Sequence, residues 1–188
     1  MTIAERHLPC ICGKLDNRSI QDIESHKVGV WEKLIDRVEI VVSSIVAYKE
    51  SHFYSEEEAG IPKPINLTRL IQHGKIKEIS ATPEEIADFS NYFDRVFIFG
   101  IDDGEIESLS LIKSGKLQNT LFCSSDGPAI QALAMIGHSN AGISMETLLK
   151  KTGLQKALEY QFGDEFFKKH IAKGSKNYIQ RVGIANRG

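Results

Sequence analysis

The sequence predicts an α/β fold in which a mostly parallel central sheet lies between two layers of helices, a three-layer α/β/α sandwich. Short apolar runs rich in β-branched residues alternate along the chain with segments of helical periodicity. No hairpin dipeptide joins one of these runs directly to the next, so we expect helical crossovers between the strands. Strands connected in this way pair in parallel and are covered on both faces.

The first predicted strand that is strongly β-branched lies between two helices. Residues 28–37 place apolar side chains at helical spacing, and residues 38–42 are rich in valine and isoleucine. Ser43 and Ser44 offer an N-cap for a helix that continues to about Tyr54. This part of the chain therefore predicts a helix, a strand and a second helix in direct succession.

Turn residues separate this unit from the next one. Residues 55–64 contain a glycine and two prolines and predict a loop, and residues 65–79 predict a short strand or helix. Thr82 is followed by a proline and then, at the third position, by Glu85. A threonine cap, proline in the first turn and glutamate three residues on are typical of a helix start, so we expect a helix from Thr82 through Phe93.

The remaining elements continue the alternation of buried strands and helices. Apolar runs predict the strands, and capping or acidic residues at a first turn predict the helices. We expect strands at 96–99, 121–123 and 142–144, and helices at 103–114, 128–136, 145–151 and 163–172.

Length and charge predict one α/β domain with an appendage. A chain of 188 residues is long enough for one well-buried core but not for two ordinary domains. The segment from Lys150 onward carries nine Lys or Arg against three acids, a net charge of +6, so the preceding part carries −8. We therefore predict a domain over residues 1–151 and a helical, basic C-terminal extension over residues 152–188, which either contacts a polyanion or only aids solubility.

Composition excludes several protein classes. Hydrophobic residues make up 41% of the chain and charged residues 26%, which are ordinary globular values. The longest apolar runs are too short to cross a bilayer, and Glu5, Arg6 and Pro9 stand where a signal peptide needs an apolar segment. Three cysteines do not form a disulfide framework. We expect a cytoplasmic protein with no membrane partner.

Acidic residues stand near the predicted carboxyl ends of the strands. They are Asp16, Glu50, Asp103, Glu105 and Asp126. Carboxylates that converge on one crevice repel each other unless a cation lies among them, and oxygen ligands without His or Cys favour Mg²⁺ or Mn²⁺. We therefore expect an Mg²⁺ or Mn²⁺ site at this edge of the sheet, with these five residues as its candidate ligands.

The order of these pieces resembles the PIN-domain nucleases over about residues 28–151. A strand and helix end in a glutamate, a helix opens with an acid-Gly-Glu-x-Glu pattern, and a strand with two small hydroxyl residues precedes an aspartate. The segments are IVVSSIVAYKE (40–50), DGEIES (103–108) and LFCSSD (121–126), continued by AIQALAMIG (129–137) and GISMETLLKK (142–151). The individual motifs are short, so their order carries most of the weight.

The resemblance implies a metal-dependent endoribonuclease that uses water to cut RNA phosphodiester bonds. Glu50, Glu105 and Asp126 would be its catalytic acids, with Mg²⁺ or Mn²⁺ as cofactor. Ser124 and Ser125 would orient Asp126 or a bound water. The implied partners are single-stranded RNA, an inhibitor or partner protein, and a second copy of the chain.

Other residues in this region and in the tail complete the predicted site. Asp103 and Glu107 would substitute for a ligand or shape the site. Candidate nucleic-acid-binding residues are Lys168, Lys169, Lys173, Lys176 and Arg181. Phe166 and Phe167 are interpreted as core residues, with base stacking as the alternative.

Several alternatives stay open at the level of sequence. The best match to the family's first strand, residues 11–17, contains Gly and Lys and lacks a hydroxyl residue after Asp16. A catalytically silent module that binds nucleic acid or a protein is therefore a second hypothesis. Asp126 is also a good helix cap, and Asp103 and Glu105 favour a helix N-terminus in any case. A zinc site at His7, Cys10 and Cys12 has only three ligands and is disfavoured.

Overall fold

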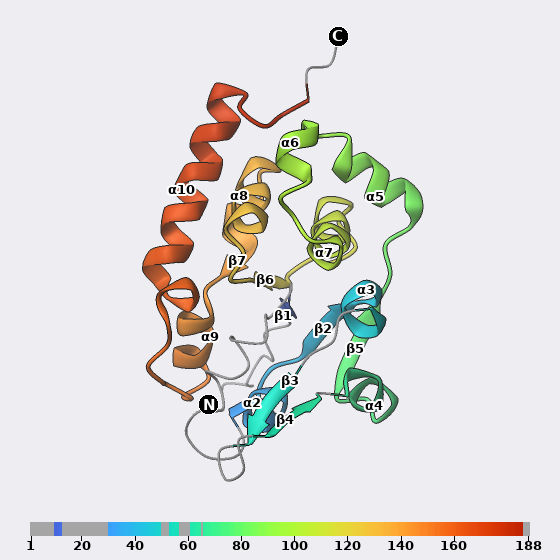
Figure 1. The fold of residues 1–188 in the computed structure, drawn as a ribbon, viewed down its shortest axis with the longest axis vertical. Helices are drawn as coiled ribbons and strands as arrows, with labels where there is room; N and C mark the ends of the chain where they lie inside the picture. The colour runs from blue at the N-terminus through green and yellow to red at the C-terminus, as the bar shows by residue number, and fades with distance from the viewer. Residues whose placement is uncertain (1–9, 13–29, 50–52, 57–60, 65, 186–188) are drawn as a thin grey trace, which may run out of the picture.

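The protein has a mixed α/β fold with short parallel strands (Figure 1). The computed structural model describes residues 10–12, 30–49, 53–56, 61–64 and 66–185. Within these ranges, no helix combines the length and the apolar composition needed to cross a bilayer.

The central sheet is parallel throughout the described strands. Its five strands lie in the spatial order β5-β2-β1-β6-β7. They are β1 (Cys10–Cys12), β2 (Ile40–Ser43), β5 (Ile76–Ile79), β6 (Leu121–Cys123) and β7 (Gly142–Ile143). In the middle of the sheet, Ile11 lies opposite Val41 on one side and Phe122 on the other. The chain extends the sheet from β1 to β2 and β5, then crosses to place β6 and β7 on the opposite side of β1.

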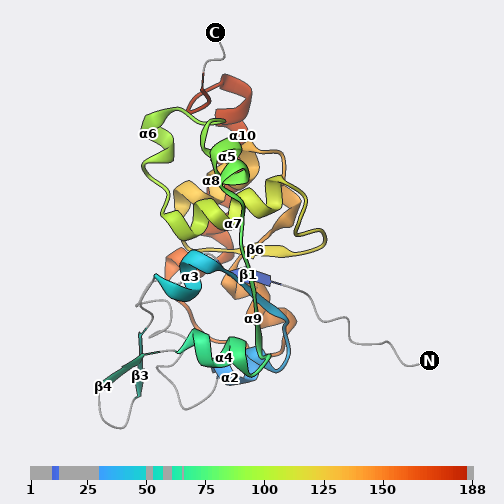
Figure 2. The ribbon, with the colours of Figure 1, turned by 90° about the vertical axis from the view of Figure 1, so that its right-hand side faces the viewer.

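Helices connect the strands and lie around the sheet (Figures 1 and 2). Those of the first half are α2 (Val30–Ile35), α3 (Ser44–Tyr48), α4 (Leu67–Gln72), α5 (Pro83–Ser90) and α6 (Arg95–Ile98). Those of the second half are α7 (Asp103–Lys113), α8 (Gly127–Met135), α9 (Met145–Lys151) and α10 (Asp164–Gln180), with short 3-10 helices η1 (Ser139–Ala141) and η2 (Tyr160–Phe162).

The buried hydrophobic side chains of the described residues form two clusters, because successive side chains along a strand point to opposite faces. Ile40 and Val42 of β2 belong to one cluster with residues of α2, α4 and α9. Val41 belongs to the other cluster with Phe122 of β6 and residues of α5, α7 and α8. Successive strand residues point to opposite faces, so β2 contributes to both clusters. Each fully buried side chain of this size contributes about 1.5–3 kcal/mol relative to an exposed one.

Two predicted helix starts are confirmed in detail. The Thr82 hydroxyl accepts a hydrogen bond from the Glu85 amide at 3.3 Å, and the Glu85 carboxylate accepts one from the Thr82 amide at 2.7 Å. These two bonds form the predicted capping box of α5. Ser43 caps α3 by accepting a hydrogen bond from the Val46 amide at 3.4 Å.

The predicted helix to Tyr54 and the predicted loop over residues 55–64 are both wrong. Helix α3 ends at Tyr48, and β3 (Phe53–Glu56) pairs antiparallel with β4 (Ile61–Pro64). Figure 2 shows this pair of strands projecting away from the central sheet. In a two-stranded ribbon each strand has an unpaired edge, so prolines are tolerated there although they end an interior strand.

The predicted strand at residues 96–99 is a turn of helix. Asp94 caps α6, its carboxylate accepting a hydrogen bond from the Phe97 amide at 2.8 Å. Val96 and Phe99 lie three residues apart on the outer side of this turn and are each 87% exposed. A local cap therefore overrides the apolar composition of the run.

Three further elements differ from prediction in extent. Helix α5 ends at Ser90, three residues before the predicted end at Phe93. Residues 65–79 form both alternatives in succession, α4 and then β5. Helix α10 continues to Gln180, eight residues beyond the predicted end at 172. It lies alongside α8 (Figure 1), and the chain after it returns to the body through a β-bridge between Ile184 and Phe93.

Candidate functional site

The candidate site lies at the carboxyl edge of the sheet, where the strand order reverses. The reversal falls between β1 and β6, because the chain builds outward from β1 in both directions. In open parallel sheets this is the position where ligands bind. Strand β6 ends at Cys123 and leads directly into Ser124, Ser125 and Asp126.

Glu105 meets the end of β6 through Ser124. Glu105 lies in the first turn of α7 and is fully buried. The Ser124 hydroxyl donates a hydrogen bond to Glu105 Oε1 at 2.6 Å and accepts one from the Asp126 amide at 2.9 Å. Ser124 therefore connects two of the predicted acidic positions, which are far apart in the sequence.

Asp126 is the N-cap of α8. Its Oδ1 accepts a hydrogen bond from the Ala129 amide at 2.7 Å, which satisfies one of the free amides at the start of the helix. The capping interpretation of Asp126 is thus correct. Capping engages Oδ1 with an amide donor and keeps the half-buried carboxylate at the carboxyl end of β6.

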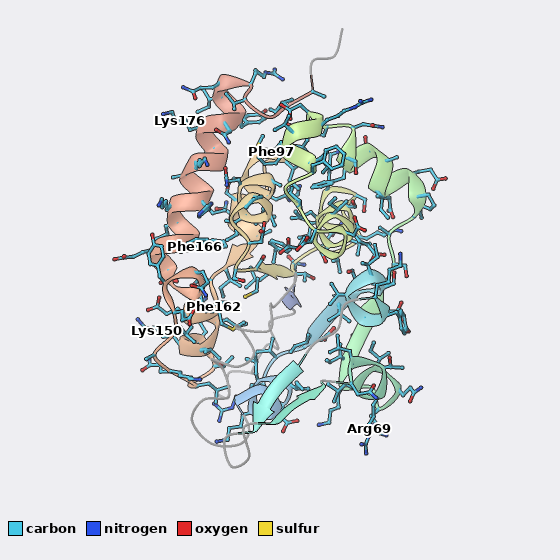
Figure 3. All side chains as sticks on the ribbon, in the orientation of Figure 1. Arg69, Phe97, Lys150, Phe162, Phe166 and Lys176 are labelled. Carbon is cyan, nitrogen blue, oxygen red and sulfur yellow. The ribbon has the colours of Figure 1, made fainter. Side chains whose placement is uncertain are left out.

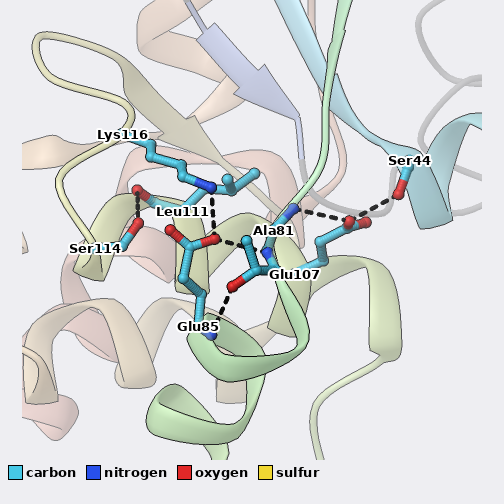
Figure 4. A network of polar contacts seen from close by, with 8 residues as sticks. Ser44, Ala81, Glu85, Glu107, Leu111, Ser114 and Lys116 are labelled. Carbon is cyan, nitrogen blue, oxygen red and sulfur yellow. Dashed lines mark hydrogen bonds and ion pairs between the residues drawn. The ribbon is translucent and has the colours of Figure 1, made fainter.

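Glu107 lies two residues beyond Glu105 and joins the ends of β2 and β5 (Figure 4). Its carboxylate accepts hydrogen bonds from the Ser44 hydroxyl at 2.7 Å, the Ile45 amide at 2.8 Å and the Ala81 amide at 3.2 Å. Glu107 is 2% exposed, and its donors come from the start of α3 and the residue that precedes the α5 cap. These contacts give Glu107 a structural role at the edge.

The other predicted site residues have different positions. Asp103 begins α7 and is exposed, and Ser125 is half-buried between Ser124 and Asp126. Asp16 and Glu50 lie outside the described residues. Of the predicted acidic residues, the structure therefore brings Glu105 and the Asp126 loop together.

The donor atoms at this edge fit a hard divalent cation in chemistry. Glu105 and Asp126 offer carboxylate oxygens, which Mg²⁺ and Mn²⁺ prefer. In the part of the chain that the structure describes, no group of three or more His, Cys, Asp or Glu side chains is arranged to hold a metal ion. Water would complete the coordination of an ion held by Glu105 and Asp126, and Asp16 and Glu50 are the further predicted ligands.

His170 is a neighbour of this site that the sequence did not reveal. Its imidazole lies against Gly127, where an added Cβ would come within 2.3 Å of the ring. Gln131 Nε2 lies 3.0 Å from the Gly127 carbonyl and 3.1 Å from His170 Nδ1. This contact fits a neutral ring with its proton on Nε2, in which the Gln131 amide donates to Nδ1.

The electrostatic surroundings of His170 favour the same neutral form. Burial lowers the pKa of His170, and the positive charges of Lys173 and Lys169 lower it further, against a smaller opposite effect of a hydrogen bond with the Gly127 backbone. The sequence signal for this contact is weak: a glycine directly after Asp126 and a histidine in a distant helix. Only the packing of α10 on α8 joins them.

The predicted basic residues of α10 are exposed. Lys168 forms an ion pair with Asp164 at 3.9 Å. Lys169, Lys173 and Lys176 form no ion pair with any other described residue. Arg181 follows the helix in a left-handed conformation, with φ of 56°. Helix α10 therefore presents uncompensated positive charge beside an acidic edge.

Comparison of the chain with protein-family models, with curated proteins and with solved structures found no match.

Proposed function

We propose that the protein is a PIN-like, metal-dependent endoribonuclease whose site lies at the carboxyl edge between β1 and β6. We propose with it that the two core clusters and the sheet between them correspond to a PIN-like three-layer sandwich. The parallel order β5-β2-β1-β6-β7 supports this proposal, because it provides one switch point for a ligand.

The observation that carries the proposal is the burial of Glu105 beside the Asp126 loop. A carboxylate in the interior is costly unless it is hydrogen-bonded or paired with a cation. Glu105 is fully buried and receives a hydrogen bond from Ser124, which also fixes the backbone of Asp126. A polar cluster at a ligand-binding position of the fold is typical of a functional site.

Different residues of this chain would have different roles in RNA hydrolysis. Glu105 and Asp126 would be ligands of the cation, with Asp16 and Glu50 as the expected further ligands, and Ser124 would hold Glu105 in orientation. A bound Mg²⁺ or Mn²⁺ supplies water activation near neutral pH and offsets charge on the phosphate. The positive face of α10 would hold the RNA backbone close to this edge.

The experiment that tests the proposal is RNA cleavage by the purified full-length chain. With Mn²⁺ or Mg²⁺ the protein should cut single-stranded RNA, and Asp126→Asn should abolish the cut. Asparagine is as good an N-cap as aspartate, so this variant removes the charge while α8 keeps its cap.

A matched control is Asp88→Asn, which removes an exposed carboxylate on α5 that pairs with Lys113. It should leave cleavage unchanged. Equal cleavage by the wild type and by Asp126→Asn would contradict the proposal and indicate a contaminating nuclease.

A second candidate function is a catalytically silent module that binds RNA or a protein. The favouring observation is that Glu107 and Asp126 both serve as caps, and that no group of three metal-ligating side chains exists among the described residues. This alternative predicts RNA or partner binding that depends on the chain after Lys150 and is unaffected by removal of divalent ions. A strict metal requirement for binding would contradict it.

A further inference from the structure

Three aromatic rings form a row on the surface beside the candidate site. Tyr160 of η2 contacts Phe166 of α10 edge to face, with ring centroids 5.6 Å apart. Phe166 lies against His170 one helical turn on, with centroids 4.3 Å apart and planes tilted by 40°. Tyr160 is 57% exposed and Phe166 is partly exposed. We call Tyr160, Phe166 and His170 the aromatic row.

The aromatic row ends at the candidate site. His170 contacts Gly127, the residue directly after Asp126, and a side chain at Gly127 would overlap the ring. The row therefore extends from the start of α8 along the first turns of α10 to η2. It gives an apolar, aromatic surface that leads to the carboxyl end of β6.

Lysines follow the same side of α10. On an α-helix, positions 166, 169, 170 and 173 share one face, because residues three and four apart are neighbours. Lys169 and Lys173 are close enough to His170 to lower its pKa. Lys176 lies three residues beyond Lys173, a spacing that makes the two neighbours on a helix. We call Lys169, Lys173 and Lys176 the lysine flank. Lys168 is not among the positions that share this face, and it pairs with Asp164 at 3.9 Å.

The packing of α10 fixes the direction in which this face points. Gly174 lies so close to α8 that an added Cβ would be 2.4 Å from the Gln131 carbonyl oxygen. Asn177 donates a hydrogen bond to Gln131 Oε1 at 3.4 Å, about two turns beyond the His170 contact. The helix cannot rotate about its axis without losing these contacts. In Figure 3 Phe166 and Lys176 mark the two halves of this anchored helix.

We propose that the aromatic row and the lysine flank form a binding surface for an unpaired RNA strand, with bases stacked on Tyr160 and Phe166 and phosphates along the lysine flank. The surface would guide the strand toward Asp126, so the inference rests on the proposed function for its biological ligand. Aromatic faces accept any base, and lysines bind phosphate as point charges.

The chemistry favours a single strand over a duplex. In a duplex the base faces are stacked on one another and are inaccessible to a side chain, whereas unpaired bases can stack on exposed rings. Three uncompensated lysines beside the rings favour a polyanion over an apolar protein partner. Binding should therefore be sequence-tolerant and sensitive to salt.

The test is a binding measurement without divalent ions, so that no cleavage occurs. Fluorescence anisotropy of a labelled single-stranded oligoribonucleotide should report binding by the full-length chain, and the same sequence as a duplex should bind more weakly. Phe166→Leu keeps the apolar contact and removes the aromatic face, and should weaken binding by roughly tenfold. Tyr160→Leu should have a similar effect.

Charge variants separate the lysine flank from general electrostatics. Replacing Lys169 and Lys173 with glutamine should weaken binding and reduce its dependence on salt. Lys168→Gln is the control for each single replacement, Lys169→Gln or Lys173→Gln, because it also removes one positive charge from α10 but lies outside the lysine flank, and it should change binding much less. Circular dichroism of each variant should show unchanged helix content.

The outcomes also separate this inference from the proposed function. Single-strand binding that Phe166→Leu weakens, in a protein that never cleaves, would support the surface and contradict the nuclease. Cleavage that Asp126→Asn abolishes, with equal RNA affinity in the wild type and in Phe166→Leu, would contradict the surface. Equal affinity for the duplex, or equal loss in Lys168→Gln, would contradict it as well.

Discussion

The carboxyl edge of the sheet has two halves that use acidic residues differently. At the ends of β2 and β5, Glu107 accepts three hydrogen bonds from fixed donors and holds the starts of two helices together. At the end of β6, Glu105 meets Ser124 and, through it, the loop of Asp126. The two glutamates are two residues apart in the same helix, and both are buried.

This difference shows that burial alone does not identify a functional acid. Glu107 is explained by the backbone amides that it caps, as expected of a structural buried carboxylate. Glu105 is next to a hydroxyl residue and a strand end at the switch point, which is where ligand chemistry occurs in this class of sheet. We therefore assign a structural role to the half around Glu107, whereas the half around Glu105 contains the proposed cation site.

The largest expected effect on the free energy of unfolding comes from substitution of the two glutamates. The difference between their losses is also the clearest test of their different roles. Glu107→Gln replaces an acceptor oxygen by a donor that faces existing donors, and should lower the free energy of unfolding by about 2–3 kcal/mol. Glu105→Gln retains an acceptor for Ser124 and should cost clearly less. Urea unfolding followed by circular dichroism measures both. Equal losses would contradict the assignment of distinct roles.

Gly174→Ala should have an intermediate effect on the free energy of unfolding. It acts on the packing of α10 against α8, the helix that follows β6. The new Cβ would meet the Gln131 backbone at 2.4 Å, so α10 must move away from α8. We expect a loss of about 1–2 kcal/mol, because overpacking costs more than the gain in helix propensity from alanine. Ser175→Ala, next along the helix, is the control and should be nearly neutral. Increased stability of Gly174→Ala would show that α10 is not closely packed there.

The smallest expected effect is on the pH dependence of the free energy of unfolding, and it comes from Asp164 at the start of α10. Hydrogen bonds from Ser144 and Thr147, followed by the charges of Lys168 and Lys150, hold the pKa of Asp164 below its ordinary value of 3.8. A carboxyl whose pKa is lower in the folded state stabilises the protein above its ordinary pKa. This stabilisation is lost as the pH falls through the folded value.

As the pH falls below about 4, the free energy of unfolding should therefore decrease less in Asp164→Asn than in the wild type. Urea midpoints measured as a function of pH for the two proteins report this difference. Parallel pH profiles would show that Asp164 contributes nothing to the acid sensitivity of this region.

Local signals in the sequence predicted much of the fold. The capping box at Thr82, the cap at Ser43 and the β-branched run at β2 each specify an element through contacts between neighbouring residues. Ser144, predicted as the last residue of a strand, is instead the N-cap of α9. The antiparallel pair β3 and β4 was missed because its prolines indicate a loop, and they are tolerated only at the edges of a ribbon. Helix α6 was missed because four apolar residues in a row indicate a buried strand.

The candidate site could be predicted only in part, because its contacts are tertiary. The order of the motifs indicated Glu105 and Asp126 but not that Ser124 would connect them. Glu107 belongs to the same short motif as Glu105, so the sequence does not distinguish the two. Only the hydrogen bonds of Glu107 with Ser44 and Ala81 show its structural role. His170 carries no local signal, since its contact with Gly127 depends on how α10 lies across α8.

The most direct test of the functional assignment is calorimetric titration of Mn²⁺ into the wild type, Glu105→Gln and the control Asp88→Asn. The account predicts that Mn²⁺ binds to the wild type and to Asp88→Asn with equal affinity. Its affinity for Glu105→Gln should be lower by roughly tenfold or more. Identical Mn²⁺ affinity in all three proteins, or no binding to the wild type, would contradict a cation site at the end of β6.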